Sequence, residues 1–218
     1  MLVIGLYYSD DAVTIYHGDC REILPSLESV DLVLTDPPYG IDYQSARRID
    51  WQRQEKIEGD DAFPVWIFDE LKPGVALFVW CRWDLLRLLP QPKSFIVWDK
   101  GNHSMGDWEH EYGRQWEGCA FYPGPEHSFV KRPVDIIRCN KIPPLELQHP
   151  NEKPVGAIKP LLLAHPADTV LDPFMGSGTT LRAAKDLGRK AIGIEIEERY
   201  CEIAAKRMSQ SVMMLEAV

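Results

Sequence analysis

Apolar residues occur in short runs along the chain, and turn-forming or charged residues interrupt nearly every run. Short apolar runs that end at Pro, Gly or Asp are typical of buried strands. Longer stretches in which apolar positions recur every three or four residues are typical of helices. The short runs predict strands at 12–16, 31–35, 75–80, 94–98, 168–172 and 190–195. The longer stretches predict helices at 21–27, 63–71, 154–165, 179–187 and 197–208.

The predicted strands and helices alternate, most clearly from residue 154 onward. Alternation of this kind predicts βαβ units, and therefore a mostly parallel sheet with helices on both faces. The expected fold class is α/β, and the 218 residues fit a single domain, 1–218, without an internal repeat. Residues 41–61 are polar and predict a surface loop. Residues 101–113 are rich in Gly, His and Trp, and their pattern predicts no element.

Composition argues against several classes of protein. Apolar residues make up 45% of the chain, which suits a packed core, yet no run approaches the roughly 18 residues of a membrane span. The N-terminal residues lack the basic start and the cleavage site of a signal peptide. Five scattered cysteines without a CxxC pair argue against a zinc site and against a disulfide framework. We therefore expect a cytoplasmic protein without a bound metal.

The stretch TDPPYG at 35–40 follows a predicted strand and must turn sharply, because neither proline has an N–H to give to a strand ladder. It places a carboxylate on one side of two rigid prolines and an aromatic ring on the other. Such an arrangement is suited to holding a planar polar group. Asp and Pro are also common in plain turns, so an ordinary turn is the alternative interpretation.

A second turn, DPFMGSGTT at 172–180, follows one predicted strand and opens a helix. Its glycines let backbone and ligand approach closely, and Glu195, at the end of the next predicted strand, can accept hydrogen bonds from ribose hydroxyls. No Lys follows the second glycine, and Leu181 stands where GxGxxG has its third glycine, so a diphosphate is not clearly provided for. S-adenosylmethionine, an adenosine ligand without phosphates, fits better. A plain turn with an exposed Glu195 is the alternative.

Together the two motifs resemble those of the DNA amino-methyltransferases, which methylate the exocyclic nitrogen of adenine or cytosine. DPPY at 36–39 precedes the cofactor loop, an order that resembles the permuted beta group of this family. Further segments that resemble the family are YHGDC at 16–20, LKPG at 71–74, HPNEKP at 149–154 and GIE at 193–195. The resemblance implies a Rossmann-like, S-adenosylmethionine-dependent methyltransferase fold. It has no firm counterpart for 100–148, where we expect a small target-recognition insertion.

The resemblance also implies roles for individual residues. Asp36 and the Pro37 carbonyl would each accept an N–H of the target amine, which localises the nitrogen lone pair toward the methyl donor. Tyr39 would stack on the base, which must be flipped out of the duplex. The implied catalytic residues are Asp36, Pro37, Pro38 and Tyr39. The residues implied for S-adenosylmethionine are Asp19, Cys20, Lys153, Asp172, Pro173, Phe174, Gly176, Ser177, Gly178, Thr179 and Glu195.

Double-stranded DNA is the expected partner, although a net charge of −9 gives no global sign of binding to a polyanion. A local basic face is enough to contact phosphates. Arg47 and Arg48 lie in the loop after DPPY among balancing acids, so phosphate contact and a merely solvated loop are equally expected there. Lys131 and Arg132 lie in a net basic stretch where the family carries its target-recognition region, and we expect them to touch DNA. The sequence leaves a homodimer open.

Adenine N6 is the expected target, because DPPY is commoner in that subgroup and cytosine-N4 enzymes often begin the motif with Ser. Methylation of cytosine N4 in DNA is the first alternative. A methyltransferase acting on RNA or on a protein amide is another enzyme class, and a non-catalytic DNA-binding relic of the fold is a third alternative. Intact Asp36, Tyr39, Asp172 and Glu195 speak against a relic. The expected setting is the cytoplasm of a bacterial, archaeal or phage-infected cell, with or without a restriction enzyme.

Overall fold

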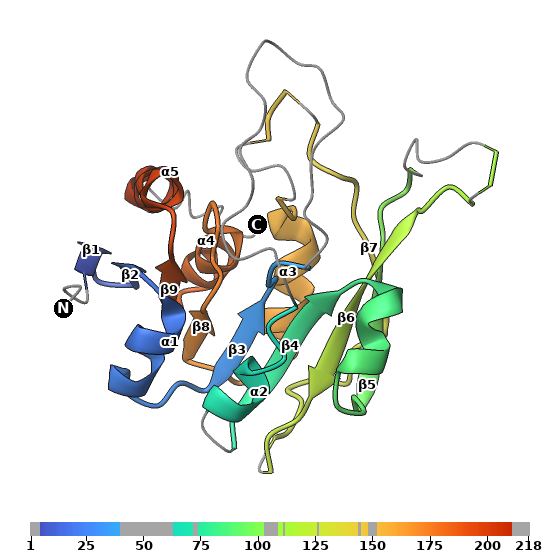
Figure 1. Ribbon diagram of the computed structural model, residues 1–218, viewed down its shortest axis with the longest axis horizontal. Coiled ribbons are helices and arrows are strands. Elements are labelled where there is room, and N and C mark those ends of the chain that lie inside the picture. The colour runs from blue at the N-terminus through green and yellow to red at the C-terminus, as the bar shows by residue number, and fades with distance from the viewer. Residues whose placement is uncertain are drawn as a thin grey trace, which may run out of the picture.

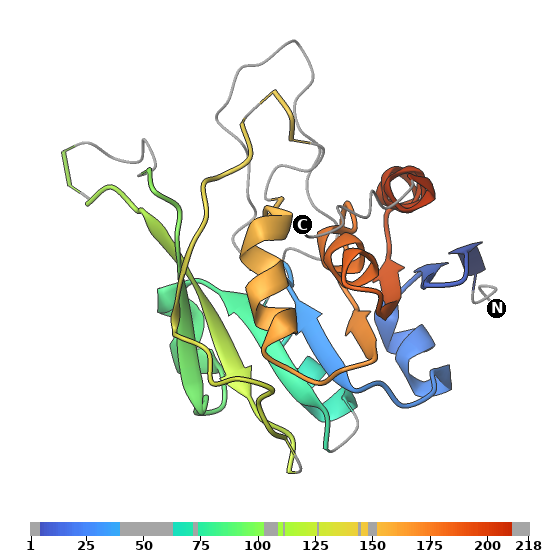
Figure 2. The same cartoon turned by 180° about the vertical axis from the view of Figure 1, so that it is seen from behind.

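A computed structural model describes residues 5–39, 63–71, 74–102, 109–110, 112–125, 127–143, 145–147 and 152–210. Within these ranges one nine-stranded sheet forms the centre of the molecule, with the strand order β1-β2-β9-β8-β3-β4-β6-β5-β7. Helices cover both of its faces, as the two opposite views show (Figures 1 and 2). The predicted α/β class, with a mostly parallel sheet, is confirmed.

The middle of the sheet is parallel, and antiparallel pairs flank it on both sides. Parallel pairing joins β2 to β9, β9 to β8, β8 to β3 and β3 to β4. At one end β1 runs antiparallel to β2, and at the other β6 lies antiparallel between β4 and β5, with β7 parallel to β5. The strands are β1 (Gly5–Ser9), β2 (Val13–His17), β3 (Leu32–Thr35), β4 (Ala76–Cys81), β5 (Ser94–Asp99), β6 (Trp116–Tyr122), β7 (Ile136–Arg138), β8 (Thr169–Asp172) and β9 (Lys190–Glu195).

The longer helices cover one face of the sheet and the shorter ones cover the other. Side chains of α3 (Val155–Leu163), α4 (Thr179–Asp186) and α5 (Glu198–Ser209) join one buried apolar cluster, on the face seen in Figure 2. Side chains of α1 (Cys20–Ile23) and α2 (Ile67–Glu70), and of the 3-10 helices η1 (Leu24–Ser26) and η2 (Trp83–Leu88), join the cluster on the opposite face. Both faces of the central strands are therefore shielded from water.

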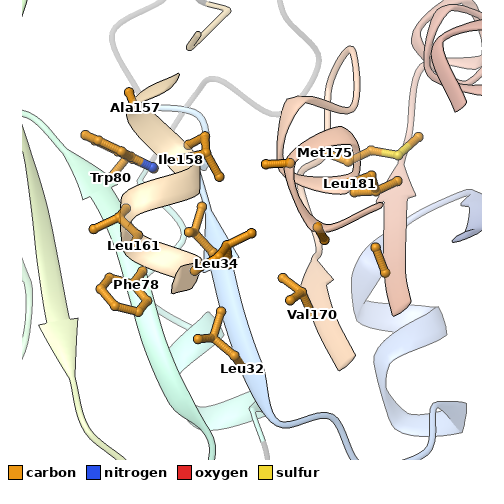
Figure 3. Close-up of a cluster of buried hydrophobic side chains, with 14 of the residues drawn as sticks. Leu32, Leu34, Phe78, Trp80, Ala157, Ile158, Leu161, Val170, Met175 and Leu181 are labelled. Atoms are coloured by element: carbon orange, nitrogen blue, oxygen red, sulfur yellow. The ribbon is translucent and has the colours of Figure 1, made fainter. Parts of the chain in front are cut away.

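The central strands are apolar throughout because they have a helix layer on either side. Every residue of β3 and of β4 is buried. Figure 3 shows Phe78 and Trp80 of β4 lying against α3 on the side of Leu161, whereas Val79 belongs to the opposite cluster. Alternate residues of one strand thus anchor both helix layers, and this fixes the ends of β3 and β4 rigidly.

The parallel strands all end at the same side of the sheet, which we call the carboxyl edge. The segments that carry the sequence motifs follow β2, β3, β8 and β9, so they gather at this edge. β6 runs in the opposite direction, which places its first residues, Trp116 and Glu117, at the carboxyl edge too, across from Asp99 at the end of β5. In Figure 1 the carboxyl edge is the upper side of the sheet.

The predicted strands agree with the structure to within a residue at each end, but two predicted helices are shorter. The helix expected at 21–27 is α1 followed by η1, because Pro25 has no N–H for an α-helical bond. The helix expected at 63–71 narrows to α2, which begins after Pro64. The strands β1, β6 and β7 were not predicted. β6 begins with Trp, Glu and Gly, and this mixed composition hides a strand whose later residues are buried.

The strands β6 and β7 both lie within 100–148, the segment in which we expect a target-recognition insertion. They belong to the central sheet, and β6 is hydrogen-bonded on both of its sides. This part of the segment therefore builds the fold. A recognition role falls instead on the connections around these strands, and it stays a prediction.

Two histidines share an aromatic cluster at the end of α3, away from the carboxyl edge. His165 is 2% exposed, and its ring centroid lies 4.5 Å from that of His127. Phe78, Phe121 and Phe129 surround the two rings. Burial lowers the pKa of His165 to about 4 and also lowers the pKa of His127, because apolar surroundings disfavour a charged imidazolium.

The His165 imidazole is expected to make the fold sensitive to acid. Its pKa is about 4 when folded and about 6.5 when unfolded, so the unfolded chain binds more protons between these values. The free energy of unfolding therefore falls as the pH drops through this window, by up to about 3 kcal/mol from this group. Urea unfolding at a series of pH values should show a shallower decline for His165→Phe than for the wild type. Parallel declines would contradict the prediction.

Candidate active site

Four loops meet at the carboxyl edge because the strands before them, β2, β9, β8 and β3, are neighbours in the sheet. Ligands of open α/β sheets bind outside the carboxyl ends of the strands. The two sequence motifs are joined directly here, since the Thr35 hydroxyl donates to Asp172 Oδ1 at 2.9 Å. This hydrogen bond fixes the start of DPPY against the start of the glycine loop.

Asp172 connects the DPPY turn to the glycine loop through hydrogen bonds of its carboxylate. Its carboxylate is 3% exposed and also accepts the backbone N–H of Phe174 at 3.2 Å. Burial raises its pKa to about 6, although hydrogen bonds from Thr180 and Thr35 oppose the rise. These hydrogen bonds go to Thr35 before one loop and to Phe174 and Thr180 of the other, so Asp172 fixes the two loops relative to each other.

The glycine loop turns through two left-handed residues, Gly176 with φ +51° and Gly178 with φ +80°. Glu195 at the end of β9 holds this turn: its Oε2 accepts the Gly176 N–H at 2.9 Å, and its Oε1 accepts the Glu197 N–H at 2.9 Å. Burial raises the pKa of Glu195 to about 7. Each carboxylate oxygen has a second lone pair, so Glu195 can still accept hydroxyl donors of a ligand at this edge.

Gly178 is expected to tolerate no side chain. A Cβ at this position would lie 3.0 Å from the Ala204 Cβ on α5, and φ +80° is unfavourable for any other residue. Gly188 is a matched control, because its φ is +70° but nothing lies within 4 Å of an added Cβ. We expect Gly188→Ala to lower the free energy of unfolding by about 1 kcal/mol and Gly178→Ala by about 2–3 kcal/mol. Equal losses in urea unfolding would contradict the close contact.

Ser177 and Thr179 of the glycine loop are bound from the side of α5. Arg207 Nη1 donates to the Ser177 carbonyl and to Thr179 Oγ1, each at 3.1 Å, while its Nη2 pairs with the carboxylate of Glu152. The arginine therefore ties the glycine loop to the turn before α3, where Lys153 follows. Sequence reasoning missed Arg207 and Glu152, because a helical arginine and a loop glutamate carry no local pattern.

Asp19 and Cys20 stand beside the same loop. The Gly18 N–H donates to the Glu195 carbonyl at 2.9 Å, which sets the turn after β2 against the end of β9. Asp19 caps α1 by accepting the Arg21 N–H at 2.9 Å and also pairs with the Arg21 guanidinium, while Cys20 is buried. On the other side of the loop, Pro173 is buried and the half-buried Phe174 ring contacts that of Trp66. This edge offers a carboxylate, close backbone and a ring, which is a donor and acceptor set that suits an adenosine ligand.

Asp36 lies at the centre of the edge, immediately after β3. Both of its oxygens have partners, since Tyr39 donates its hydroxyl to Oδ1 at 2.7 Å and Lys153 Nζ pairs with Oδ2. The Asp36 side chain is 26% exposed, Pro37 is buried, and Pro38 and Tyr39 are half-buried. Burial raises the pKa of Asp36, and the Lys153 ammonium opposes this rise. The structure thus brings the DPPY carboxylate and Lys153 together.

Lys153 is shared between two carboxylates. Besides Asp36, its Nζ lies 3.3 Å from Oε2 of Glu117, whose Oε1 pairs with Lys100. Burial alone would lower the pKa of Lys153, but the two carboxylates outweigh it and the pKa is raised. Burial alone would raise the pKa of the Glu117 carboxyl, but the two lysine ammonium groups outweigh burial and the pKa is lowered. Sequence reasoning missed Glu117 and Lys100, although an acid at the head of the apolar run GCAFY was a usable signal.

Of the four predicted DNA contacts, Lys131 and Arg132 lie within the described residues. Arg47 and Arg48 fall outside the described residues. Lys131 and Arg132 are exposed in the connection between β6 and β7, which starts at the edge opposite Asp36 and ends beside Val97, in the middle of β5. The neighbouring Val130 N–H donates to the Ala164 carbonyl behind α3. The structure therefore does not bring Lys131 and Arg132 to the candidate site, and their contact with DNA stays a prediction against which this placement weighs.

Among the described residues no three His, Cys, Asp or Glu side chains gather as a metal site would require. None of the described helices has the length and apolar character needed to cross a membrane.

Comparison with known proteins identifies the family pattern. A family model described as DNA methylase matches residues 97–206, half of the chain. The DNA adenine methyltransferase YhdJ of Escherichia coli (strain K12) is 28% identical over 255 residues, which cover 92% of this chain and 84% of the relative. The type II methyltransferase M2.DpnII of Streptococcus pneumoniae is 28% identical over 253 residues, which cover 95% and 94%.

Solved structures of the same kind share the fold. The crystal structure of the M1.HpyAVI–SAM complex superposes with a TM-score of 0.68 at 22% identity and covers 91% of this chain and 100% of that one. The PvuII DNA methyltransferase, titled as cytosine-N4-specific, superposes with a TM-score of 0.67 at 18% identity and covers 94% and 89%. At such identities the likeness shows the fold, which is the S-adenosylmethionine-dependent methyltransferase fold expected from the sequence.

Proposed function

The chain belongs to the DNA methylase family, whose N6 and N4 members act on exocyclic base nitrogens, and from this premise we propose that it transfers a methyl group from S-adenosylmethionine to N6 of a flipped-out adenine in DNA. One observation carries the proposal. Asp36, which leads the DPPY turn, and the glycine loop, whose Gly176 N–H binds Glu195, lie at one edge and are joined through Thr35 and Asp172. A carboxylate for the amine and a site for the methyl donor are thereby held side by side.

The residues around the glycine loop fit S-adenosylmethionine. Glu195 would accept the ribose hydroxyls, since it keeps lone pairs beside the two backbone N–H groups that it binds. Asp19 and Cys20 would border the adenine from the β2 side, and Phe174 would offer its ring. Gly176, Ser177, Gly178 and Thr179 would bring the backbone close. When bound, the cofactor supplies an electrophilic methyl group on a sulfonium centre.

Asp36 prepares the amine of the base. An exocyclic amine is a poor nucleophile because its lone pair is delocalised into the ring. Asp36 accepts one N–H and the Pro37 carbonyl accepts the other, and the two acceptors together favour a tetrahedral nitrogen whose lone pair points at the methyl group. The rigid prolines keep the carbonyl aimed, so little reorganisation is needed. When the nitrogen has gained its fourth bond, it loses a proton, for which Asp36 is the adjacent acceptor.

Tyr39 would occupy one position in the free protein and another when a base is bound. In the structure its hydroxyl occupies Oδ1 of Asp36, the oxygen that an incoming amine would use. Stacking of the ring on a flipped base would move the hydroxyl away and release that oxygen. In this proposal the ring binds the base, and the hydroxyl occupies Oδ1 only until the base arrives. Unpairing the base itself costs a few kcal/mol, which stacking on Tyr39 would partly offset.

Adenine is preferred over cytosine because Asp, rather than Ser, leads the tetrapeptide, and because the relative YhdJ is named a DNA adenine methyltransferase. Cytosine N4 is the second candidate, favoured by the structural likeness to the PvuII enzyme. The chemistry at Asp36 serves both amines equally. The choice between them depends on the pocket that holds the ring of the base.

The test is a nucleoside analysis by mass spectrometry after the purified protein has been incubated with S-adenosylmethionine and DNA of varied sequence. The proposal predicts N6-methyladenine. N4-methylcytosine would keep the mechanism and overturn the choice of base. Parallel incubations with RNA and with a protein extract detect the other enzyme class. Cofactor binding without any product, or no binding at all, would favour the alternatives in which DNA is bound but not methylated.

A further inference from the structure

Glu117 links the two buried lysines of the carboxyl edge. One of its oxygens pairs with Lys100 and the other lies 3.3 Å from Nζ of Lys153, which also pairs with Asp36. The four side chains form a row of alternating charge, Asp36–Lys153–Glu117–Lys100, whose formal charges cancel. The side chains of Lys153 and Lys100 are 5% and 9% exposed, so these ion pairs are shielded from water.

The row is held in place by aromatic rings. Lys153 Nζ lies 5.2 Å from the ring centroid of Trp80 and 5.9 Å from that of Tyr39, while Lys100 Nζ lies 5.5 Å from that of Trp98. Trp80 is fully buried between β4 and α3 (Figure 3), so it cannot yield. The ammonium of Lys153 is therefore fixed between a ring and two carboxylates. A buried lysine that bonded to Asp36 alone would carry no such constraint.

The constraint matters for the reaction because one oxygen of Asp36 has to bind Lys153 while the other has to bind the amine of the base. Oδ2 is paired with Lys153, and Oδ1, bound by the Tyr39 hydroxyl at 2.7 Å, is the oxygen that an amine would take. An ammonium group free to move would shift toward the strongest negative charge within reach and compete with the amine for both oxygens. A second carboxylate on the far side of the ammonium group prevents that shift.

We propose that Glu117 is a positioning residue of the methyl transfer: it holds the Lys153 ammonium on Oδ2 of Asp36 and so leaves Oδ1 to the amino group of the base. The inference rests on the proposed function, in which Asp36 binds that amino group. Glu117 itself touches neither the base nor the cofactor. Lys100 in turn fixes Glu117 and balances its charge.

The charged groups that face Asp36 determine in which direction each substitution should shift the pKa of Asp36. From its own loop Asp36 meets the Tyr39 hydroxyl, from the turn before α3 it meets Lys153, and from β6 it feels Glu117, whose charge raises its pKa. The neighbouring Cys81 and Cys119 have raised thiol pKa values and stay neutral. Asp172 couples weakly to Asp36. Removing the Glu117 charge therefore lowers the pKa of Asp36, and removing the Lys100 charge raises it.

The experiment compares Glu117→Gln, Glu117→Asp and Lys100→Met with the wild type on DNA, with kcat measured across pH. For Glu117→Gln we expect kcat on its plateau to fall about 10- to 100-fold, the cost of a misplaced group, with KM for S-adenosylmethionine unchanged. The acid limb should move about one pH unit lower for Glu117→Gln and shift upward for Lys100→Met. Glu117→Asp keeps the charge and should restore the position of the acid limb.

A second readout follows the carboxyl carbon of Asp36 by ¹³C NMR titration, assigned with Asp36→Asn, and needs no activity. An unchanged plateau for Glu117→Gln, or an acid limb that does not move, overturns the inference while the methylation by wild-type protein upholds the proposed function. If the wild type itself methylates no DNA, the proposed function fails. The titration then decides alone: opposite shifts for Glu117→Gln and Lys100→Met support the arrangement, and an unmoved Asp36 overturns it.

Discussion

Replacing Asp36 with alanine is expected to lower the rate of DNA methylation by about 10²- to 10³-fold, the usual cost of losing one preorganised polar contact to a developing charge. The substitution removes the acceptor for the amine and the nearest acceptor for its proton. Binding of S-adenosylmethionine should be unaffected, because the hydrogen bonds that hold Glu195 come from the Gly176 and Glu197 N–H groups and remain in the variant. Single-turnover methylation and calorimetric titration of the cofactor measure the two quantities separately.

The Asp36→Ala variant leaves the buried ammonium group of Lys153 without its Asp36 partner, and the control has to take this into account. Lys153 loses one partner in Asp36→Ala but keeps Glu117 at 3.3 Å, so the buried ammonium group remains paired and the fold is expected to survive. Asp36→Asn, which keeps the shape and loses the charge, should lose a similar share of the rate. A folded Asp36→Ala protein that methylates DNA as fast as the wild type would show that the carboxylate has no part in the chemistry.

Replacing Glu195 with glutamine is expected to weaken S-adenosylmethionine binding by about 10- to 100-fold, the worth of a hydrogen bond to a charged acceptor. The variant also loses a pH dependence. Burial raises the pKa of Glu195 to about 7, so the wild-type carboxylate is ionised above this value and becomes protonated below it. Wild-type affinity should therefore decline as the pH falls below about 7, whereas the affinity of the variant should stay level.

The matched control is Glu198→Gln, an exposed glutamate in the first turn of α5. It changes the net charge equally and should leave the affinity for the cofactor as it is. The affinity of both variants for S-adenosylmethionine is measured by calorimetric titration at several pH values over about three units, from about 5.5 to about 8.5. Equal affinities of the wild type and Glu195→Gln at all pH values would remove Glu195 from the cofactor site.

The parallel half of the fold could be predicted from the sequence because local signals agree there. The run TVLD, the loop with Gly176 and Gly178, and the helix ended by Gly188 each have one interpretation, and β8, α4 and β9 follow them closely. The antiparallel end could not be predicted in the same way. β7 has three residues and lies at the sheet edge, and β6 gains its place only by pairing with two strands distant in sequence.

The candidate site divides along similar lines. Asp36 and Glu195 could be chosen from sequence because each ends a strand within a compact motif, and strand ends meet at one edge. For Glu117 the sequence offers only an acid at the head of the apolar run GCAFY, and its place at the site depends on the antiparallel direction of β6, which brings the first residues of that strand to the carboxyl edge. Lys153 was assigned to the cofactor from the HPNEKP segment, whereas in the structure its ammonium group pairs with Asp36 and Glu117.

The proposed chemistry depends on the carboxylate of Asp36. Its Oδ2 is paired with Lys153, and its Oδ1 is the oxygen proposed to bind the amine. In the proposed mechanism the glycine loop, the Thr35–Asp172 hydrogen bond and the row of buried charges would together place that carboxylate beside the methyl donor.

The most direct measurement is the content of methylated nucleosides in DNA from a bacterial host that lacks its own DNA methyltransferases and expresses either the wild-type chain or Asp36→Ala. The account predicts N6-methyladenine in DNA from cells with the wild-type chain and a background level in DNA from cells with the variant. A soluble, folded wild-type protein that binds S-adenosylmethionine and leaves the DNA free of any methylated amine would contradict it.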